Sequence, residues 1–220
     1  MILPGQGIEE YEREIVRAVL RRHGLPESIL MDIPLPAPLP CFEVHKRIPE
    51  NVLIAGLSKV DDRLFQATLR ISDRQEMVLD HTTGSHVTGM VITEAVRQMS
   101  VVVGERHLLT PTGTARRFIL NSLQTTFHKF LLPLPTRLEY TLEHIERKGP
   151  DRLRFKGRCD FLQTDVLAAS GSMALTVIDA QRAEQIEAVG IRRTTRTLAK
   201  RHTEQRGVTE HLALGRADAS

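Results

Sequence analysis

One amphipathic segment, preceded by a polar loop, constrains the fold of this chain more than any other stretch. From residue 89 onward, apolar residues recur at spacings of three, four and seven, which predicts a helix with one apolar stripe. Thr88 stands where an N-cap residue is expected, and Gly89 would let another chain or a ligand approach the first turn closely. We expect this helix to end near Leu109 and to be the centre of the fold. The stripe consists of Ile92, Ala95, Val96, Met99, Val102 and Val103.

Three polar residues interrupt this apolar helix. Glu94, Arg97 and Gln98 share one side of it, because residues three and four apart are neighbours on a helix. A carboxylate at the edge of a core is costly unless it is paired or hydrogen-bonded. Two interpretations stay open. Glu94 and Arg97 form a structural ion pair, or Glu94 faces a reacting carbonyl together with a histidine.

The loop before the helix carries two histidines, His81 and His86. Imidazole titrates near neutral pH, so either ring suits a general base, and Glu94 would orient that histidine or act as the base itself. The amides of Gly89 and Met90 lie at the positive end of the helix dipole and suit a developing oxyanion. We therefore treat His81, His86 and Glu94 as the candidate catalytic residues, without choosing between the histidines.

Six runs with strand character surround this helix in the sequence. Several of them alternate apolar and polar residues, which is typical of half-buried strands, and turn residues separate most of them. Two runs precede the helix and form an expected hairpin, and four follow it. The pattern predicts an α+β fold in which an antiparallel sheet wraps around one helix. The runs are residues 52–60, 64–72, 118–130, 138–144, 153–161 and 166–178.

The two ends of the chain differ from this central region. Residues 8–23 predict a short amphipathic helix, and residues 33–40 form a proline-rich linker. After residue 179 we expect a short helix over 180–189 and then a mobile basic tail. The predicted organisation is an N-terminal helix and linker at 1–41, one domain at 42–179, and a C-terminal extension at 180–220.

Composition excludes several classes of protein. The net charge of +3 suits an acidic partner, and the absence of Trp argues against a base-stacking nucleic-acid platform. No apolar run is long enough to cross a membrane, and no signal peptide is visible. Only Cys41 and Cys159 are present, so a reducing cytoplasm is the default, and Cys159 alternates with core-type aromatics. No residue cluster has metal-ligand spacing.

Two stretches in order resemble the A-factor biosynthesis hotdog family, the γ-butyrolactone synthases of signalling-molecule pathways. The first is residues 44–54, Val-His-Lys-Arg-Ile-Pro-Glu-Asn-Val-Leu-Ile. The second runs from Asp80 to Gln98 and contains Asp-His, Gly-Met-Val, Glu-Ala and Arg-Gln elements. The resemblance covers about residues 42–178. It implies a single hotdog domain, an antiparallel sheet wrapped around a long central helix.

The resemblance also implies an activity. A β-ketoacyl group would pass from an acyl carrier protein or CoA thioester to a small hydroxyl acceptor such as dihydroxyacetone phosphate, in γ-butyrolactone or butenolide-type secondary metabolism. The substrate carries its own phosphopantetheine, and no other cofactor or metal is expected. Arg97, Gln98, His45 and Lys46 become candidate substrate-binding residues, beside the amides of Gly89 and Met90.

Larger members of that family carry two hotdog repeats, whereas this chain carries one. A single repeat exposes a sheet edge, so we expect a homodimer with sites at the subunit interface. The composition leads us to expect no nucleic-acid or membrane partner. Two alternatives remain for the function. One is a hotdog thioesterase or dehydratase acting on a carrier-bound acyl chain, although neither loop histidine stands at the dehydratase spacing from Glu94. The other is a non-catalytic acyl-binding subunit.

Overall fold

The computed structural model describes residues 1–32, 36–79, 85–110, 115–149 and 152–217, and only the backbone of helical residues 78–79 and 204–217. The chain divides into two compact units. One comprises residues 1–112 and 118–177, and the other comprises residues 113–117 and 178–220. The candidate site lies wholly in the first unit, and the C-terminal helix belongs to the second.

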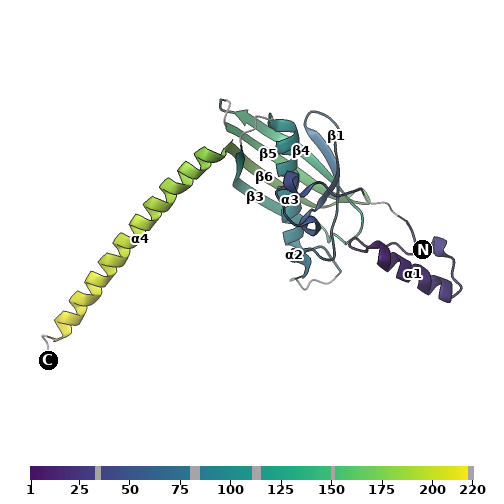
Figure 1. Ribbon diagram of the computed structural model, residues 1–220, viewed down its shortest axis with the longest axis horizontal. Coiled ribbons are helices and arrows are strands. Elements are labelled where there is room, and N and C mark those ends of the chain that lie inside the picture. The colour runs from purple at the N-terminus through teal and green to yellow at the C-terminus, as the bar shows by residue number, and fades with distance from the viewer. Residues whose placement is uncertain (33–35, 80–84, 111–114, 150–151, 218–220) are drawn as a thin grey trace. The chain divides into compact units, whose positions relative to one another are not determined.

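A six-stranded sheet with the order β1-β2-β4-β5-β6-β3 forms the framework (Figure 1). The pairs β1–β2, β2–β4 and β4–β5 are antiparallel, and their register places Phe65, Tyr140 and Cys159 side by side across three strands. The six predicted strands and the first hairpin are confirmed. The strands are β1 (Ile54–Lys59), β2 (Leu64–Leu69), β3 (Arg116–Phe127), β4 (Thr136–Arg147), β5 (Arg152–Gln163) and β6 (Val166–Asp179).

The predicted central helix is α3 (Gly89–Val103), which continues as a π-helical turn, η4 (Gly104–Leu108). The Thr88 side chain accepts a hydrogen bond from the Val91 amide, so the predicted N-cap is confirmed. All six residues of the predicted apolar stripe are buried. Together with the antiparallel sheet, α3 gives the α+β architecture expected from the sequence.

A glycine sets how closely α3 approaches the sheet. A Cβ built on Gly171 of β6 would lie 2.4 Å from Cγ2 of Val96 on α3. Real Cβ atoms do not come this close to a carbon, so the contact requires glycine at this strand position. The distance between α3 and the sheet, and with it the position of the polar residues of α3, therefore depends on Gly171.

The N-terminal segments belong to the first unit. Helix α1 (Glu10–Arg22) has a capping box between Glu9 and Glu12, and it occupies the predicted range. A short helix α2 (Glu76–Leu79) and three 3-10 turns complete the elements before α3. The end of the proline-rich segment contacts the start of β1, where the Leu39 amide donates a hydrogen bond to the Ile54 carbonyl at 2.9 Å. The turns are η1 (Glu27–Ile29), η2 (Cys41–Val44) and η3 (Pro49–Asn51).

The C-terminal extension differs from the prediction. Helix α4 runs from Ala180–Ala217 without interruption, so the expectation that the helix stops near Val189 is wrong. The apolar pattern fades after that residue, but the following residues are largely Arg, Thr, Ala, Leu and Lys with no proline, and most of them tolerate or favour a helix. Propensity rather than amphipathicity therefore sustains the second half of α4. No helix in the described chain has the length and apolarity needed to span a bilayer.

Burial agrees with the expectation for Cys159. This residue is fully buried on β5, and burial raises the pKa of its thiol far above the ordinary value. A thiol held protonated in the core is not a nucleophile at neutral pH.

Replacing Gly171 with alanine tests the close approach of α3 to β6. We expect Gly171→Ala to lower the free energy of unfolding by about 2 kcal/mol, because the added methyl group collides with Val96. Urea denaturation measures the change. Gly190→Ala on α4, where nothing lies within 4 Å of the new methyl, is the control and should be neutral or stabilising. Equal stabilities of the Gly171→Ala variant and the wild type would contradict the packing argument.

Candidate functional site

The two sequence stretches singled out above meet in one ionic cluster. Oε1 of Glu94 accepts hydrogen bonds from Lys46 Nζ at 2.8 Å, Arg97 Nη2 at 2.7 Å and Gln98 Nε2 at 3.0 Å. Arg97 Nε also donates to Oε2 of Glu94 at 2.8 Å, so the guanidinium forms hydrogen bonds to both carboxylate oxygens. The structure thus brings four of the predicted site residues together.

Backbone contacts tie this cluster to the segment before β1. Arg97 Nη2 donates to the Val44 carbonyl at 2.9 Å. The Gln98 side chain is fully buried, donates to the Asn51 carbonyl at 2.8 Å, and accepts from the Leu53 amide at 2.8 Å. Residues 44–53 have little regular structure of their own, so these contacts from α3 hold them in place.

Charge balance within the cluster favours an ionised Glu94. Burial alone would raise the pKa of the Glu94 carboxyl, but Arg97, Lys46 and Gln98 together outweigh burial and place the pKa below its ordinary value. The side chain of Glu94 is 14 % exposed, whereas those of Lys46 and Arg97 are 25 % and 26 % exposed. Two cations and one carboxylate leave the cluster with one net positive charge, presented by the more accessible groups.

His45 lies next to Lys46 in sequence but its ring has other partners. Its backbone is left-handed, with φ of 54°. Nε2 lies 3.1 Å from Oε1 of Glu105, and the ring meets Phe118 edge-on at 5.1 Å between centroids. Neighbouring Glu43 and Arg106 form a second ion pair between the same two segments. His45 therefore attaches the η2 region to the end of the central helix.

The start of α3 is covered by residues from the end of β3 and the segment after it. A Cβ at Gly89 would lie 3.0 Å from the Phe127 ring, so the group that closely approaches this glycine belongs to the same chain. The His86 ring lies 5.0 Å from the ring of Phe130, which is 77 % exposed. Met90 faces solvent with 62 % exposure. His81 lies outside the described residues.

Sequence reasoning missed two residues that organise this region. The backbone carbonyl of Asn51 accepts a hydrogen bond from the Gln98 side chain. The Asn51 side chain donates to Glu76 of α2 at 2.6 Å, which links α2 to the cluster. The motif at 44–54 contains Asn51, so its position was a usable signal. Glu105, the partner of His45, stands sixty residues away in sequence, and no local pattern identifies it.

Three comparisons with known proteins complete the description. The family model for the A-factor biosynthesis hotdog domain matches residues 31–179. No curated protein matches the sequence. Among solved structures, the thioesterase HI1161 from Haemophilus influenzae is 12 % identical, with 57 % of this chain and 78 % of that chain covered, at a TM-score of 0.42. A mutant thioesterase PA1618 from Pseudomonas aeruginosa is 12 % identical, covering 57 % and 81 %, at a TM-score of 0.43.

Acid titration of stability tests the electrostatics of Glu94. Its pKa is lower in the fold than in the unfolded chain, so the unfolded state takes up the proton first as pH falls. The contribution of Glu94 is complete above its ordinary pKa of 4.5 and is lost as pH falls through the lower folded value. We expect urea denaturation at stepped pH to show this loss in the wild type and a flatter profile for Glu94→Gln. Glu187→Gln, which removes an exposed carboxylate on α4, should keep the wild-type profile.

Proposed function

Because the chain belongs to the A-factor biosynthesis hotdog family, we propose that it transfers a β-ketoacyl group from a carrier-protein thioester to a small phosphorylated hydroxyl acceptor. The observation that carries this proposal is the convergence of the two motif stretches on Glu94. Lys46 from one stretch and Arg97 and Gln98 from the other contact the same carboxylate. The proposed acceptor is dihydroxyacetone phosphate-like, as the family membership implies, and the pathway would be of the γ-butyrolactone or butenolide type.

The net positive charge of the cluster supports an acceptor that carries a phosphate. Lys46 and Arg97 retain exposed surface, and Glu94 holds both cations in position without cancelling them. Lys and Arg are the side chains that proteins use to bind phosphate oxygens. In this proposal Glu94 is a positioning residue, because its lowered pKa makes it a weak base in the resting protein.

The transfer itself requires one base and one set of amide donors. The acceptor hydroxyl oxygen attacks the thioester carbon, while a loop histidine, His81 or His86, takes the hydroxyl proton. Amides of Gly89 and Met90 at the start of α3 would hold the oxyanion. Collapse of the intermediate breaks the carbon–sulfur bond, forms the ester and releases the pantetheine thiolate, which recovers the proton. The phosphopantetheine arrives and leaves with the carrier, so no resident cofactor is used.

A homodimer would complete the site. β3 stands at the end of the sheet, and it leaves Ile119, Leu120 and Phe127 at least 38 % exposed. An uncovered strand edge with apolar side chains is a surface on which a second copy can pair. Since Phe127 also covers Gly89, an interface along β3 would border the start of α3. We therefore propose that two chains pair through β3 and build their sites at that interface.

A mass-spectrometric assay tests the transfer. The protein is mixed with a β-ketoacyl carrier protein, with and without dihydroxyacetone phosphate. We expect the carrier to lose its acyl group only when the acceptor is present, with formation of a new ester. Free acid without acceptor would assign a thioesterase, and loss of water from a β-hydroxyacyl control would assign a dehydratase. Tight carrier binding with no reaction would assign a non-catalytic acyl-binding subunit.

Removing the charge of Lys46 tests the phosphate site. We expect Lys46→Met to raise KM for dihydroxyacetone phosphate about tenfold, equivalent to about 1.4 kcal/mol of binding. KM for dihydroxyacetone, which lacks the phosphate, should stay unchanged. Lys59→Met on β1 is the matched control, because that lysine pairs with the surface residue Asp62. An equal rise in KM for both acceptors would contradict a role in phosphate binding.

Sedimentation velocity tests the dimer. Leu120 on β3 and Val60 after β1 are both 52 % exposed, so the two substitutions alter apolar side chains of equal fractional exposure. We expect Leu120→Lys to shift the protein toward monomer by at least tenfold in dissociation constant, and Val60→Lys to leave the dimer intact. A wild-type protein that sediments as a monomer at every concentration would overturn the interface.

A further inference from the structure

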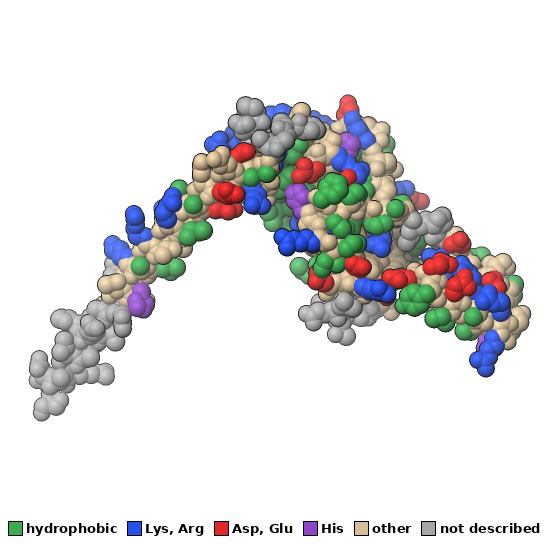
Figure 2. All heavy atoms as spheres, in the orientation of Figure 1, with side chains coloured by type: hydrophobic (Ala, Val, Ile, Leu, Met, Phe, Trp, Pro, Cys, Tyr) green, Lys and Arg blue, Asp and Glu red, His purple; other side chains and the backbone are tan. Residues whose placement is uncertain are grey.

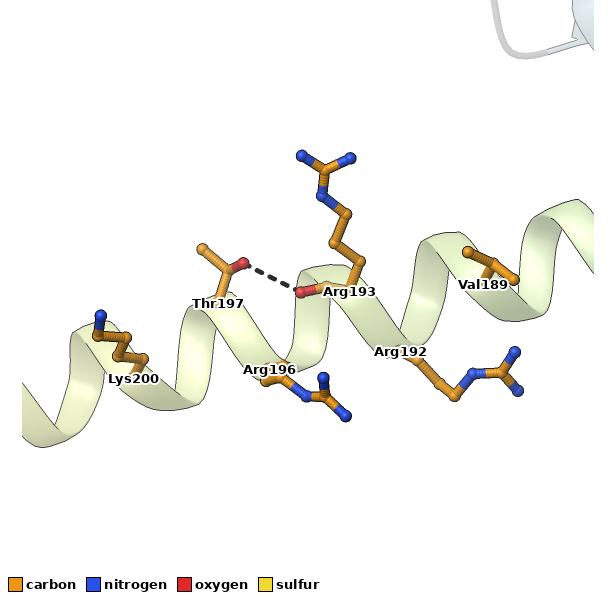
Figure 3. A pocket seen from close by; sticks show the side chains of 6 residues that line it. All are labelled: Val189, Arg192, Arg193, Arg196, Thr197 and Lys200. Carbon is orange, nitrogen blue, oxygen red and sulfur yellow. Dashed lines mark hydrogen bonds between the residues drawn. The ribbon is translucent and has the colours of Figure 1, made fainter.

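Helix α4 carries a cationic groove that the proposed reaction does not use. The lining residues follow Val189 at spacings of three, four, seven, eight and eleven. In Figure 3, Arg193, Thr197 and Lys200 point to one side of the helix, and Arg192 and Arg196 point to the other. Lys and Arg side chains also recur along α4 in the space-filling view (Figure 2). The groove is lined by Val189, Arg192, Arg193, Arg196, Thr197 and Lys200.

The stretch of sequence that lines this groove is basic. Residues 188–203 contain five Lys and Arg and no Asp or Glu, while the whole chain has a net charge of only +3. The remaining residues therefore sum to a net charge of −2. Among the described side chains, no salt bridge involves Arg192, Arg193 or Arg196. Arg196 stands four positions from both Arg192 and Lys200, and such like-charge pairs weaken a helix by a few tenths of a kcal/mol each.

The same face also offers apolar surface. Ile186 and Val189 precede the arginines by one or two turns and are 56 % and 57 % exposed. The Thr197 hydroxyl donates to the Arg193 carbonyl at 3.0 Å, so its hydrogen-bonding capacity is used within the helix. A ligand that fills this groove must present anions next to apolar groups.

These features favour a protein partner over nucleic acid or a membrane. A phosphodiester backbone supplies anions but no apolar side chains for Ile186 and Val189. An interfacial membrane helix needs its apolar residues on one face, whereas Ile191 and Leu198 lie on the side of α4 opposite the groove. An acidic amphipathic helix supplies both carboxylates and apolar side chains. An arginine guanidinium can donate two parallel hydrogen bonds to one carboxylate.

We propose that this groove on α4 is the docking surface for the acidic carrier protein that delivers the acyl thioester. The proposal rests on the proposed function, because it takes its partner from the carrier-bound substrate. Complementary charge accelerates encounter and selects the partner, and it weakens as salt concentration rises. Docking on α4 then raises the concentration of the acyl group available to the protein.

A quadruple substitution tests the docking surface. Glutamine replaces Arg192, Arg193, Arg196 and Lys200, because glutamine removes the charge and keeps helix propensity. The control variant replaces Arg21, Arg22, Arg63 and Lys148 with glutamine, which removes the same charge from exposed positions in the other unit. Circular dichroism checks that both variants retain the helical content of the wild type.

Kinetics with two forms of the same acyl group separate docking from chemistry. For the groove variant we expect KM for the β-ketoacyl carrier protein to rise at least tenfold, with kcat unchanged and the acyl-pantetheine thioester turned over normally. The wild-type KM for the carrier should rise with salt, and that of the groove variant should not. Unchanged KM in the groove variant, or an equal rise in the control variant, would overturn the proposal.

Direct binding keeps the test decisive if the wild type catalyses no transfer. Fluorescence anisotropy measures binding of a labelled bacterial acyl carrier protein to the full chain at low salt. Binding that the groove variant loses and the control variant keeps supports docking, even where the proposed transfer has failed. Absence of carrier binding overturns it, and so does binding of duplex DNA or phosphatidylserine vesicles through the groove in place of the carrier.

Discussion

The carboxylate of Glu94 is the interaction on which the candidate site depends. Lys46 comes from a segment with little regular structure, and Arg97 comes from the central helix, yet both bond to the same residue. Without this anion, two half-buried cations would face each other across a small gap, which is costly where water is partly excluded. One negative charge therefore permits a concentrated positive site to exist inside a folded domain.

The same arrangement separates the roles of the polar residues. A carboxylate held ionised by two cations organises its surroundings, and in the proposed reaction the proton is accepted instead by a group that titrates near neutral pH. Of the two interpretations raised from the sequence, the structure shows the ion pair between Glu94 and Arg97. The other, in which Glu94 faces a reacting carbonyl together with a histidine, stays a prediction.

Whether a structural feature can be predicted from the sequence depends on how far apart in the chain its interacting residues lie. Strand alternation, the stripe on α3 and the Thr88 cap are local patterns, and all of them are present in the structure. The pairing of His45 with Glu105 joins distant segments and leaves no local signal. The length of α4 was missed because the prediction followed apolar periodicity, whereas helix propensity continues past its end.

The side chain of Gln98 forms hydrogen bonds to the backbone of the segment before β1, where a neighbouring strand would otherwise pair. Its amide nitrogen donates to the Asn51 carbonyl and its amide oxygen accepts from the Leu53 amide, two residues further along. A residue of a parallel strand bonds its neighbour in the same alternating pattern, to the residues before and after the one it faces. One side chain on a helix thereby imitates a peptide group of an adjacent strand. The backbone pairing beside β1 is extended by a residue that belongs to no strand.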